Sequence, residues 1–278
     1  MNFSYLGLDE FLLSALREDI GIEDVTTKCC VPEDAVSGGY FKAKEPGIIC
    51  GLDIARRVFE LIDGDIRITS LLNDNSTVKT GDVIANISGP SRSILTGERT
   101  ALNILQHLSG VASRTAEAVA AVSGSKARIV DTRKTTPGMR MLEKYAVRCG
   151  GGSNHRFSLS DGILIKDNHI AAAGGITEAV RLARNNSPFT IKIEVETETL
   201  RQIEEALAAG ADIIMLDNMD IATMAEAVKR IGGRALVEAS GNMGERDLRA
   251  VAETGVDFIS IGALTHSVNA LDISLKFM

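Results

Sequence analysis

The feature that most constrains the fold is a regular alternation of apolar and amphipathic segments across the C-terminal two-thirds of the chain. The apolar segments are short and rich in β-branched residues, at 127–132, 162–166, 190–196, 212–217, 235–240 and 257–264. Amphipathic stretches with helical spacing follow at 176–184, 200–209, 221–231 and 245–254. Apolar strands joined by single helices pair in parallel, because only a crossover connects parallel neighbours.

Six such strands predict an α/β barrel, closed or incomplete, rather than an open dinucleotide-binding sheet. An open sheet of that kind needs a Gly-rich first turn and an acidic residue about 20 positions further on. The sequence contains no such fingerprint, which favours the barrel.

The N-terminal third has a different pattern and predicts a small α+β domain. Residues 8–18 have helical spacing, and turn clusters separate short strands at 38–44, 66–72, 76–78 and 83–88. A helix over 97–110, capped by Thr96 and with Arg99 in its second turn, is expected to lead into the barrel. We expect an N-terminal domain at 1–110, a barrel at 111–265, and a tail at 266–278 that packs back on the N-terminal domain.

Composition excludes several classes of protein. The net charge of −7 argues against non-specific nucleic-acid and membrane binding, and no apolar run reaches the roughly 18 residues of a membrane-spanning helix. The start of the chain lacks the features of a secretory signal. The cysteines, Cys29, Cys30, Cys50 and Cys149, have no metal-site spacing and predict reduced thiols. A cytoplasmic enzyme is therefore expected.

The charges are unevenly distributed. Residues 126–166 contain nine Lys or Arg and three acids, a balance of +6, which leaves −13 for the rest of the chain. A solvated basic face is one interpretation. The other is a group of cations that holds an anionic ligand.

Polar or small residues follow each predicted strand, where a parallel barrel has its active site. The first two strand ends and the loop between them supply cations, the middle two carboxylates, and the last two small residues. In that order the candidates are Arg133, Lys134, His155, Arg156 and Lys166; Glu196 and Asp217; and Ser240, Gly241 and Gly262. In this fold the loops after the last two strands commonly bind phosphate. We therefore expect a ligand with an anionic planar group, a cation-bridged polyol or pyrophosphate, and a terminal phosphate.

Glu194 and Glu196 share one face of their strand, because side chains alternate with a period of two. We expect Glu196 to face the ligand and Glu194 to lie deeper, paired with a cation such as Lys166.

Several motifs together resemble the quinolinate phosphoribosyltransferase family. The most specific are Asp131-Thr-Arg-Lys-Thr-Thr-Pro-Gly-Met-Arg140, Gly150-Gly-Gly-Ser-Asn-His-Arg156 and Asp161-Gly-Ile-Leu-Ile-Lys-Asp-Asn-His169. Shorter matches stand at Glu143-Lys-Tyr-Ala-Val147, Glu194-Val-Glu196, Met215-Leu-Asp-Asn218, Glu238-Ala-Ser-Gly241 and Ser260-Ile-Gly-Ala-Leu-Thr-His266, and others lie in the first 103 residues. The resemblance thus covers nearly the whole chain in order.

This resemblance implies an incomplete, seven-stranded α/β barrel beside an N-terminal α+β domain, in a homodimer or a higher oligomer. It also implies the transfer of phosphoribosyl from phosphoribosyl pyrophosphate to quinolinate with Mg²⁺. The products would be nicotinate mononucleotide, pyrophosphate and carbon dioxide, in NAD biosynthesis.

The resemblance also implies roles for individual residues. Arg133, His155, Arg156 and Lys166 would contact quinolinate, and Arg99 would do so from the neighbouring subunit. Lys134, Glu196 and Asp217 would act at phosphoribosyl pyrophosphate and the metal. Ser240, Gly241 and Gly262 would hold the 5′-phosphate, and Thr132, Asn242 and Ile261 complete the expected substrate-binding set. Where many members have Ser-Gly-Gly-Ile, this chain has Ser240-Gly-Asn-Met243, which leaves the role of Asn242 open.

Three other functions remain open at this point. A paralogue linked to molybdenum transport shares the fold. A Schiff-base aldolase could use Lys166, because a desolvated lysine at the end of a barrel strand can act as a nucleophile. A non-enzymatic oxyanion-binding regulator would also fit the cations. His107 and His266 are interpreted as structural or peripheral groups.

Overall fold

The computed structural model describes residues 6–278. The first five residues, which begin the expected N-terminal domain, lie outside this range. The chain divides into two compact units. The N-terminal unit contains the residues up to Arg114 together with Val268–Met278, and the barrel unit is Thr115–Ser267.

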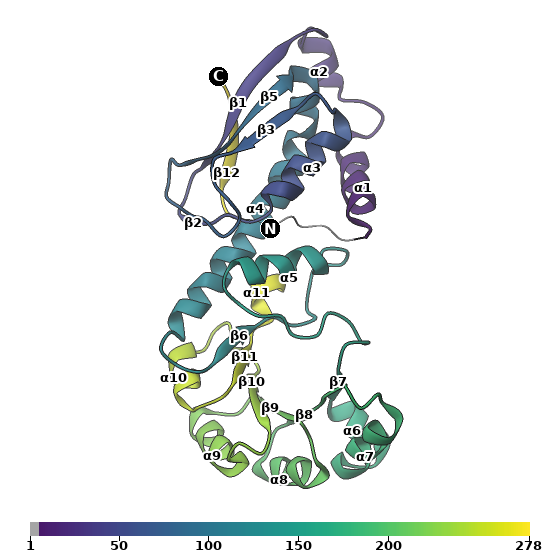
Figure 1. The fold of residues 1–278 in the computed structure, drawn as a ribbon, viewed down its shortest axis with the longest axis vertical. Helices are drawn as coiled ribbons and strands as arrows, with labels where there is room; N and C mark the ends of the chain where they lie inside the picture. The colour runs from purple at the N-terminus through teal and green to yellow at the C-terminus, as the bar shows by residue number, and fades with distance from the viewer. Residues whose placement is uncertain (1–5) are drawn as a thin grey trace. The chain divides into compact units, whose positions relative to one another are not determined.

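A four-stranded antiparallel sheet forms the centre of the N-terminal unit, in the order β12-β1-β5-β3 (Figure 1). Burial along β1 alternates towards its end, where Phe41 and Ala43 are buried, as expected of a strand with one covered face. Strands β2 and β4 form a separate antiparallel pair in the same unit. The strands are β1 (Val36–Ala43), β2 (Gly47–Ile48), β3 (Arg67–Ser70), β4 (Thr77–Val78), β5 (Val83–Pro90) and β12 (Ile273–Phe277).

Apolar helix faces complete this core. Phe59 of α3 meets Phe41 of the sheet edge to face, with ring centroids 6.3 Å apart. A Cβ at Gly97 of α4 would lie 2.7 Å from Ile62 and 3.1 Å from Phe59, so a larger residue there would require side chains of α3 to move. The helices are α1 (Leu8–Ile20), α2 (Val25–Cys30), α3 (Leu52–Ile62) and α4 (Ser91–Ala121).

The predicted start of α4 was wrong. The helix begins at Ser91, and Thr96 lies inside it, where its hydroxyl donates a hydrogen bond to Asp24 at 3.2 Å. Arg99 is therefore in the third turn and is exposed.

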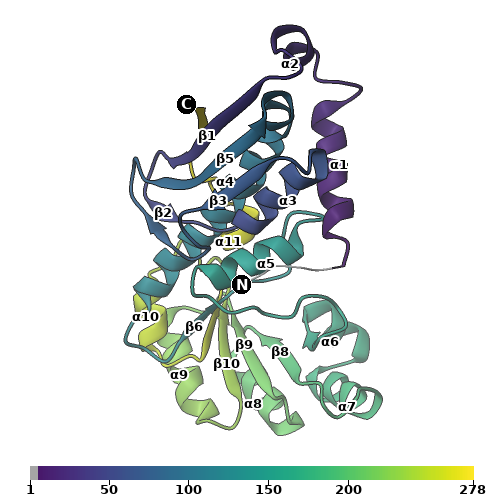
Figure 2. The same ribbon diagram turned by 45° about the horizontal axis from the view of Figure 1, so that its top comes forward.

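The barrel unit contains six parallel strands in the order β6-β11-β10-β9-β8-β7 (Figure 2). They are β6 (Arg128–Val130), β7 (Ile163–Ile165), β8 (Ile193–Thr197), β9 (Ile213–Asp217), β10 (Leu236–Ser240) and β11 (Phe258–Ser260). The prediction of an incomplete α/β barrel is confirmed, since β6 and β7 are the two edges of the sheet. A single parallel bridge between Val130 and Ser153 extends the pairing beyond β6.

Helices follow the strands and cover the outside of this sheet (Figure 1). Their starts are encoded locally: the Thr199 hydroxyl accepts from the backbone of Gln202 to cap α8, and Asp220 accepts from Thr223 to cap α9. The last predicted helix begins later than expected because Asp247 caps it. The helices are α5 (Arg140–Cys149), α6 (Asp167–Ala173), α7 (Ile176–Asn186), α8 (Leu200–Ala209), α9 (Ile221–Ile231), α10 (Leu248–Glu253) and α11 (Ala263–His266).

Candidate active site

The strand order determines how the predicted residues follow one another along the carboxyl ends of the sheet. From β7 to β6 these ends carry Lys166, Glu196, Asp217, Ser240, Gly262 and Arg133 in sequence. Cations therefore stand at both edges of the incomplete barrel, with carboxylates and small residues between them. We call this set of strand ends the carboxyl rim.

The two candidate acids of the rim end neighbouring strands. Lys166 Nζ lies 2.9 Å from Glu196 Oε2. The amide of Asn218 donates to Asp217 Oδ2 at 2.8 Å and so orients that carboxylate. The expected pairing of Lys166 with Glu194 is wrong, because Lys166 reaches only the outermost acid of β8. Glu194, buried deeper, has a different partner.

That partner is His155, which comes from the loop before β7. Its Nε2 lies 3.1 Å from Glu194 Oε2 and 3.4 Å from Glu238 Oε2, so the ring bridges β8 and β10. The other ring nitrogen, Nδ1, accepts a hydrogen bond from the backbone N–H of Arg156 at 2.7 Å. Both carboxylates are almost fully buried, and the Oε1 atom of each has no hydrogen-bond partner among the described residues.

Burial and the two carboxylates act in opposite directions on His155. Burial lowers its pKa, but hydrogen bonds and charge from Glu194 and Glu238 outweigh burial and raise the pKa to about 10. Burial and the neighbouring Glu238 raise the pKa of Glu194 to about 7, despite the opposing effect of His155. At neutral pH the folded protein therefore retains protons on this cluster of His155, Glu194 and Glu238.

This cluster also has the residue types of a metal site, since ligand atoms of His155, Glu194 and Glu238 lie within 4.8 Å of one another. The bond from Arg156 argues against that interpretation. It occupies the lone pair of Nδ1, so the ring proton of a neutral imidazole stands on Nε2, where a metal would have to bind. The geometry favours a hydrogen-bonded cluster.

Arg156 lies within electrostatic reach of both Glu194 and Arg133. Arg156 donates to the carbonyl of Gly162 at 2.8 Å, and burial and the nearby charge of Arg133 lower its pKa. The Nε of Arg133 is buried without a hydrogen-bond partner among the described residues. A buried donor of this kind costs free energy unless an acceptor reaches it, and the carboxylate of a ligand would be such an acceptor.

The segment that follows β6 lies close to the segment that follows β11. Thr132 accepts a hydrogen bond from the backbone N–H of Lys134 at 3.0 Å. The carbonyl of Lys134 accepts a hydrogen bond from the Thr265 hydroxyl at 2.7 Å. The Lys134 side chain also passes close to Gly262, because a Cβ added to Gly262 would lie 3.1 Å from Lys134 Cδ. Lys134 and the candidate phosphate loop at Ile261 and Gly262 are thus adjacent.

The second candidate phosphate loop has a tightly constrained backbone. Ser240 stands opposite Asp217 in the β-ladder. A Cβ at Gly241, where φ is +93°, would lie 2.2 Å from Asn218 Oδ1. Asn218 and Asn242 also have positive φ, at 54° and 51°, a conformation that asparagine adopts more readily than most residues. Asn242 thus keeps the turn that a glycine would make, and its side chain is exposed.

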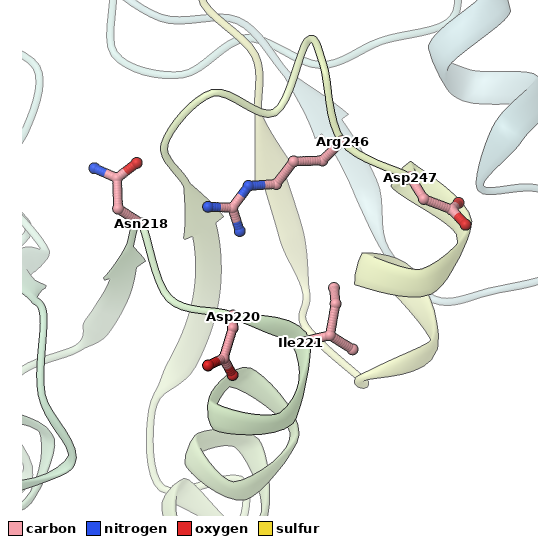
Figure 3. Close-up of a pocket in the computed structure, with 5 residues that line it drawn as sticks. All are labelled: Asn218, Asp220, Ile221, Arg246 and Asp247. Carbon is pink, nitrogen blue, oxygen red and sulfur yellow. The ribbon is translucent and has the colours of Figure 1, made fainter.

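A pocket of about 340 Å³ lies beside this loop (Figure 3). Its lining is Asn218, Asp220, Ile221, Arg246 and Asp247, from the segments that follow β9 and β10. Arg246 extends towards the β9 segment and donates to the carbonyl of Met219 at 2.6 Å.

The barrel unit therefore contains all the predicted site residues except Arg99, which is an exposed residue of α4 in the N-terminal unit. Sequence reasoning missed Glu238 as a site residue. The signal was available, because Glu238 stands two positions before Ser240 and shares its face of β10. The aldolase interpretation is not supported, since Lys166 is 46% exposed and paired with Glu196 rather than desolvated.

An incomplete parallel barrel with cations, carboxylates and Gly-containing turns along one rim defines an enzyme-like site for an anionic small molecule and phosphates. Comparison with known families agrees. Residues 24–109 match the N-terminal domain of quinolinate phosphoribosyl transferase, and residues 111–276 match its C-terminal domain. The chain belongs to the quinolinate phosphoribosyltransferase family.

Individual relatives cover nearly the whole chain. The probable nicotinate-nucleotide pyrophosphorylase (carboxylating) of Bacillus subtilis is 46% identical, over 98% of this chain and 94% of its own length. A mitochondrial quinolinate phosphoribosyltransferase (decarboxylating) of Nicotiana tabacum is 41% identical, over 97% and 82%. The solved nicotinate-nucleotide pyrophosphorylase of Francisella tularensis has a TM-score of 0.93 at 42% identity, with 98% and 96% covered.

Proposed function

We propose that this protein transfers the phosphoribosyl group of phosphoribosyl pyrophosphate to quinolinate and releases carbon dioxide, with nicotinate mononucleotide and pyrophosphate as the other products. The observation that carries this proposal is the order of side chains along the rim, cationic at both edges and acidic between them. The names of the full-length relatives support it. The reaction would belong to NAD biosynthesis.

The cations recognise quinolinate, which carries two adjacent carboxylates. Arg133 and Arg156 offer directional, bidentate hydrogen bonds, and Lys166 offers a compact charge. The unpartnered Nε of Arg133 supports this role. His155 contributes from the loop that also carries Arg156, and Arg99 completes the set from the neighbouring subunit of a homodimer.

The two rim acids act on the sugar. As pyrophosphate leaves, the anomeric carbon gains positive charge, and Glu196 and Asp217 stabilise that charge by electrostatics. They also fit Mg²⁺, which prefers carboxylate oxygens and keeps several of its waters, because both carboxylates are partly exposed on adjacent strands. Bound Mg²⁺ would neutralise charge on the pyrophosphate. Lys134, beside Gly262, would contact the phosphates of the same substrate.

The turns after β10 and β11 hold the 5′-phosphate. Ser240, Gly241 and Gly262 bring backbone N–H groups close to it, as the last loops of such barrels commonly do. Thr132, Asn242 and Ile261 complete the substrate-binding set beside them.

Decarboxylation then follows from the chemistry of the ring. The pyridine nitrogen attacks the anomeric carbon and becomes a cation. That cation accepts the electron pair released when the neighbouring carboxylate leaves as carbon dioxide, and a proton takes the place of the carboxylate. No covalent bond to the protein is needed.

We further propose a cytoplasmic homodimer or a higher oligomer. No helix within residues 6–278 is long and apolar enough to cross a membrane.

The test is carbon dioxide release from quinolinate and phosphoribosyl pyrophosphate by the purified protein with Mg²⁺. Calorimetry with quinolinate then compares Arg133→Ala with Arg184→Ala, which removes an exposed cation paired with Asp212. Loss of binding is expected in the first variant alone. Release of no carbon dioxide would contradict the proposed reaction, and near-normal affinity of Arg133→Ala would contradict the role of Arg133.

A further inference from the structure

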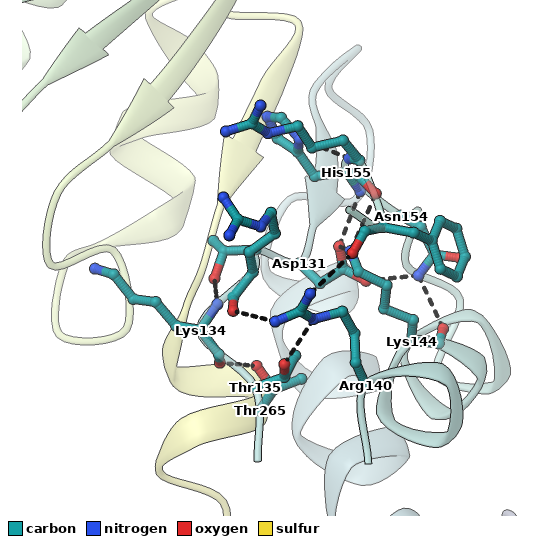
Figure 4. Close-up of polar contacts among 12 residues, drawn as sticks. Asp131, Lys134, Thr135, Arg140, Lys144, Asn154, His155 and Thr265 are labelled. Carbon is teal, nitrogen blue, oxygen red and sulfur yellow. Dashed lines mark hydrogen bonds and ion pairs between the residues drawn. The ribbon is translucent and has the colours of Figure 1, made fainter. Parts of the chain in front are cut away.

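The two loops that carry the substrate-binding cations are far apart in sequence but are connected by one helix. Arg133 and Lys134 follow β6, and His155 and Arg156 precede β7. Helix α5 lies between them in the chain, and its side chains Arg140, Glu143 and Lys144 bond to these loops. Figure 4 shows the bonds of Arg140 and Lys144.

Asp131, at the start of the first loop, is the centre of this network. Its side chain is fully buried and forms an ion pair with Lys144 of α5. It also accepts from the backbone N–H of His155 at 2.8 Å and from the amide of Asn154 at 2.6 Å. One carboxylate thus joins β6, α5 and the His155 loop.

Lys144 completes the connection from the helix. It too has no exposed side-chain surface, and it donates to the carbonyl of His155 at 3.0 Å. Its charge lies 5.1 Å from the centre of the Phe157 ring. The backbone of His155 is therefore held at both its N–H and its carbonyl by a single buried ion pair.

A second set of contacts joins the same helix to the same two loops. Arg140 of α5 donates to the hydroxyl of Thr135 at 2.9 Å in the first loop and to the carbonyl of Phe157 at 3.2 Å in the other. Glu143 accepts from the backbone N–H of Thr136 at 3.1 Å. Each loop is fixed to the same helix by more than one bond.

Stability does not account for burying these charges. Removing two ions from water costs several kcal/mol each, and apolar residues of the same volume are often as stable or more stable. Burial raises the pKa of Asp131 and lowers that of Lys144, although each partner opposes the effect on the other. Apolar side chains could fill this space, but they could not bond the backbone of His155 at a defined position.

We propose that Asp131 and Lys144 are positioning residues that hold Arg133 on one loop and His155 and Arg156 on the other at the separation that quinolinate requires. This inference rests on the proposed function and adds residues that touch no substrate. A shift of about 1 Å in a positioned group can cost roughly a hundredfold in rate. Most residues proposed at phosphoribosyl pyrophosphate, from Glu196 to Gly262, follow β8 to β11 rather than the two loops that α5 holds. Lys134 shares the first loop, but its carbonyl is also held by Thr265 at 2.7 Å, so the larger effect is expected on quinolinate.

The experiment compares wild-type protein with Asp131→Asn/Lys144→Met, which replaces the pair with neutral residues of similar size. We expect the KM for quinolinate to rise about tenfold or more, with the KM for phosphoribosyl pyrophosphate within about twofold of wild type. Lys126→Met is the matched control. It removes a 2.7 Å ion pair between Lys126, which lies just before the start of β6, and Asp257. This control should leave both KM values unchanged.

Unchanged quinolinate KM in a folded double variant would overturn the proposal, and so would equal increases in both KM values. If the double variant does not fold, Asn154→Ala removes one bond to Asp131 and should still raise the quinolinate KM selectively. Hydrogen exchange at residues 131–136 and 153–157 reports on how firmly the two loops are held, and it needs no turnover. Exchange in the variant as slow as in wild type would also count against the proposal. Absence of turnover in wild-type protein would instead defeat the proposed function alone.

Discussion

The charge of His155 provides a prediction whose size follows from the structure. Glu194 and Glu238 lie within 3.4 Å of Nε2 of its ring, and the backbone N–H of Arg156 donates to Nδ1. We expect Glu238→Gln to lower the pKa of His155 and to reduce the loss of stability that accompanies rising pH.

The magnitude combines two opposing effects. A rise in pKa from 6.5 to about 10 corresponds to about 5 kcal/mol, since each pKa unit is about 1.36 kcal/mol. The backbone N–H of Arg156 donates to Nδ1 and favours the neutral ring, which opposes that rise by about 1 to 1.5 kcal/mol. The balance stays upward because hydrogen bonds to charged acceptors are about twice as strong as neutral ones. Roughly 3 to 4 kcal/mol of folding stability is therefore linked to the His155 proton.

The sign follows from the direction of the pKa change. The folded protein binds this proton more tightly than the unfolded chain does, so the stabilisation is fully present below the unfolded pKa of 6.5. It is lost progressively as the pH rises from 6.5 towards about 10, and the opposing bond from Arg156 makes that loss complete before 10. Replacing Glu238 removes one of the two acceptors, so about half of this pH-dependent loss should disappear.

The assay has two parts. Ring resonances of the four histidines, followed by NMR against pH, give the pKa of His155 directly, and urea unfolding at several pH values gives the stability. Glu253→Gln, which removes an exposed pair with Arg249, is the control and should change neither. A wild-type His155 pKa near its ordinary value, or one that Glu238→Gln leaves unchanged, would refute the reasoning.

Three further predictions concern the proposed roles. Arg99→Ala and Lys134→Ala should each be inactive, yet a mixture should recover activity through hybrid dimers; no recovery after verified subunit exchange would defeat a shared site. Asp217→Asn should weaken Mg²⁺-dependent turnover by about tenfold or more, and an unchanged rate across a Mg²⁺ titration would remove its role. Gly241→Ala should raise the KM for phosphoribosyl pyrophosphate, because its Cβ collides with Asn218 at a positive φ; a KM equal to that of wild type would show that the turn adapts.

Much of the barrel could be predicted because its strands are apolar throughout and their carboxyl ends carry polar groups in a regular order. That rule gave the rim order of Lys166, Glu196 and Asp217. It could not give the partner of Glu194, since a period of two defines a face of the strand but not which loop reaches it. His155 comes from a loop without a repeating pattern.

Helix α5 shows a second limit. Glu143 and Lys144 are fully buried, whereas charged side chains are almost never buried without a partner. A search for helical spacing of apolar residues therefore misses α5. The burial of its charged side chains is explained only by their partners in the folded protein. The start of α4 was misplaced for a related reason, because Thr96 resembles a capping residue although the helix has already begun at Ser91.

The pairing of β12 with β1 has a consequence for how the chain folds while it is being translated. During translation the ribosome releases residues 6–114 first, but the strand that covers the edge of their sheet is made only after the whole barrel unit. Until then β1 presents unpaired backbone groups, which can recruit the wrong strand from another nascent chain. Newly made chains should therefore be most vulnerable to aggregation just before residues 273–277 emerge.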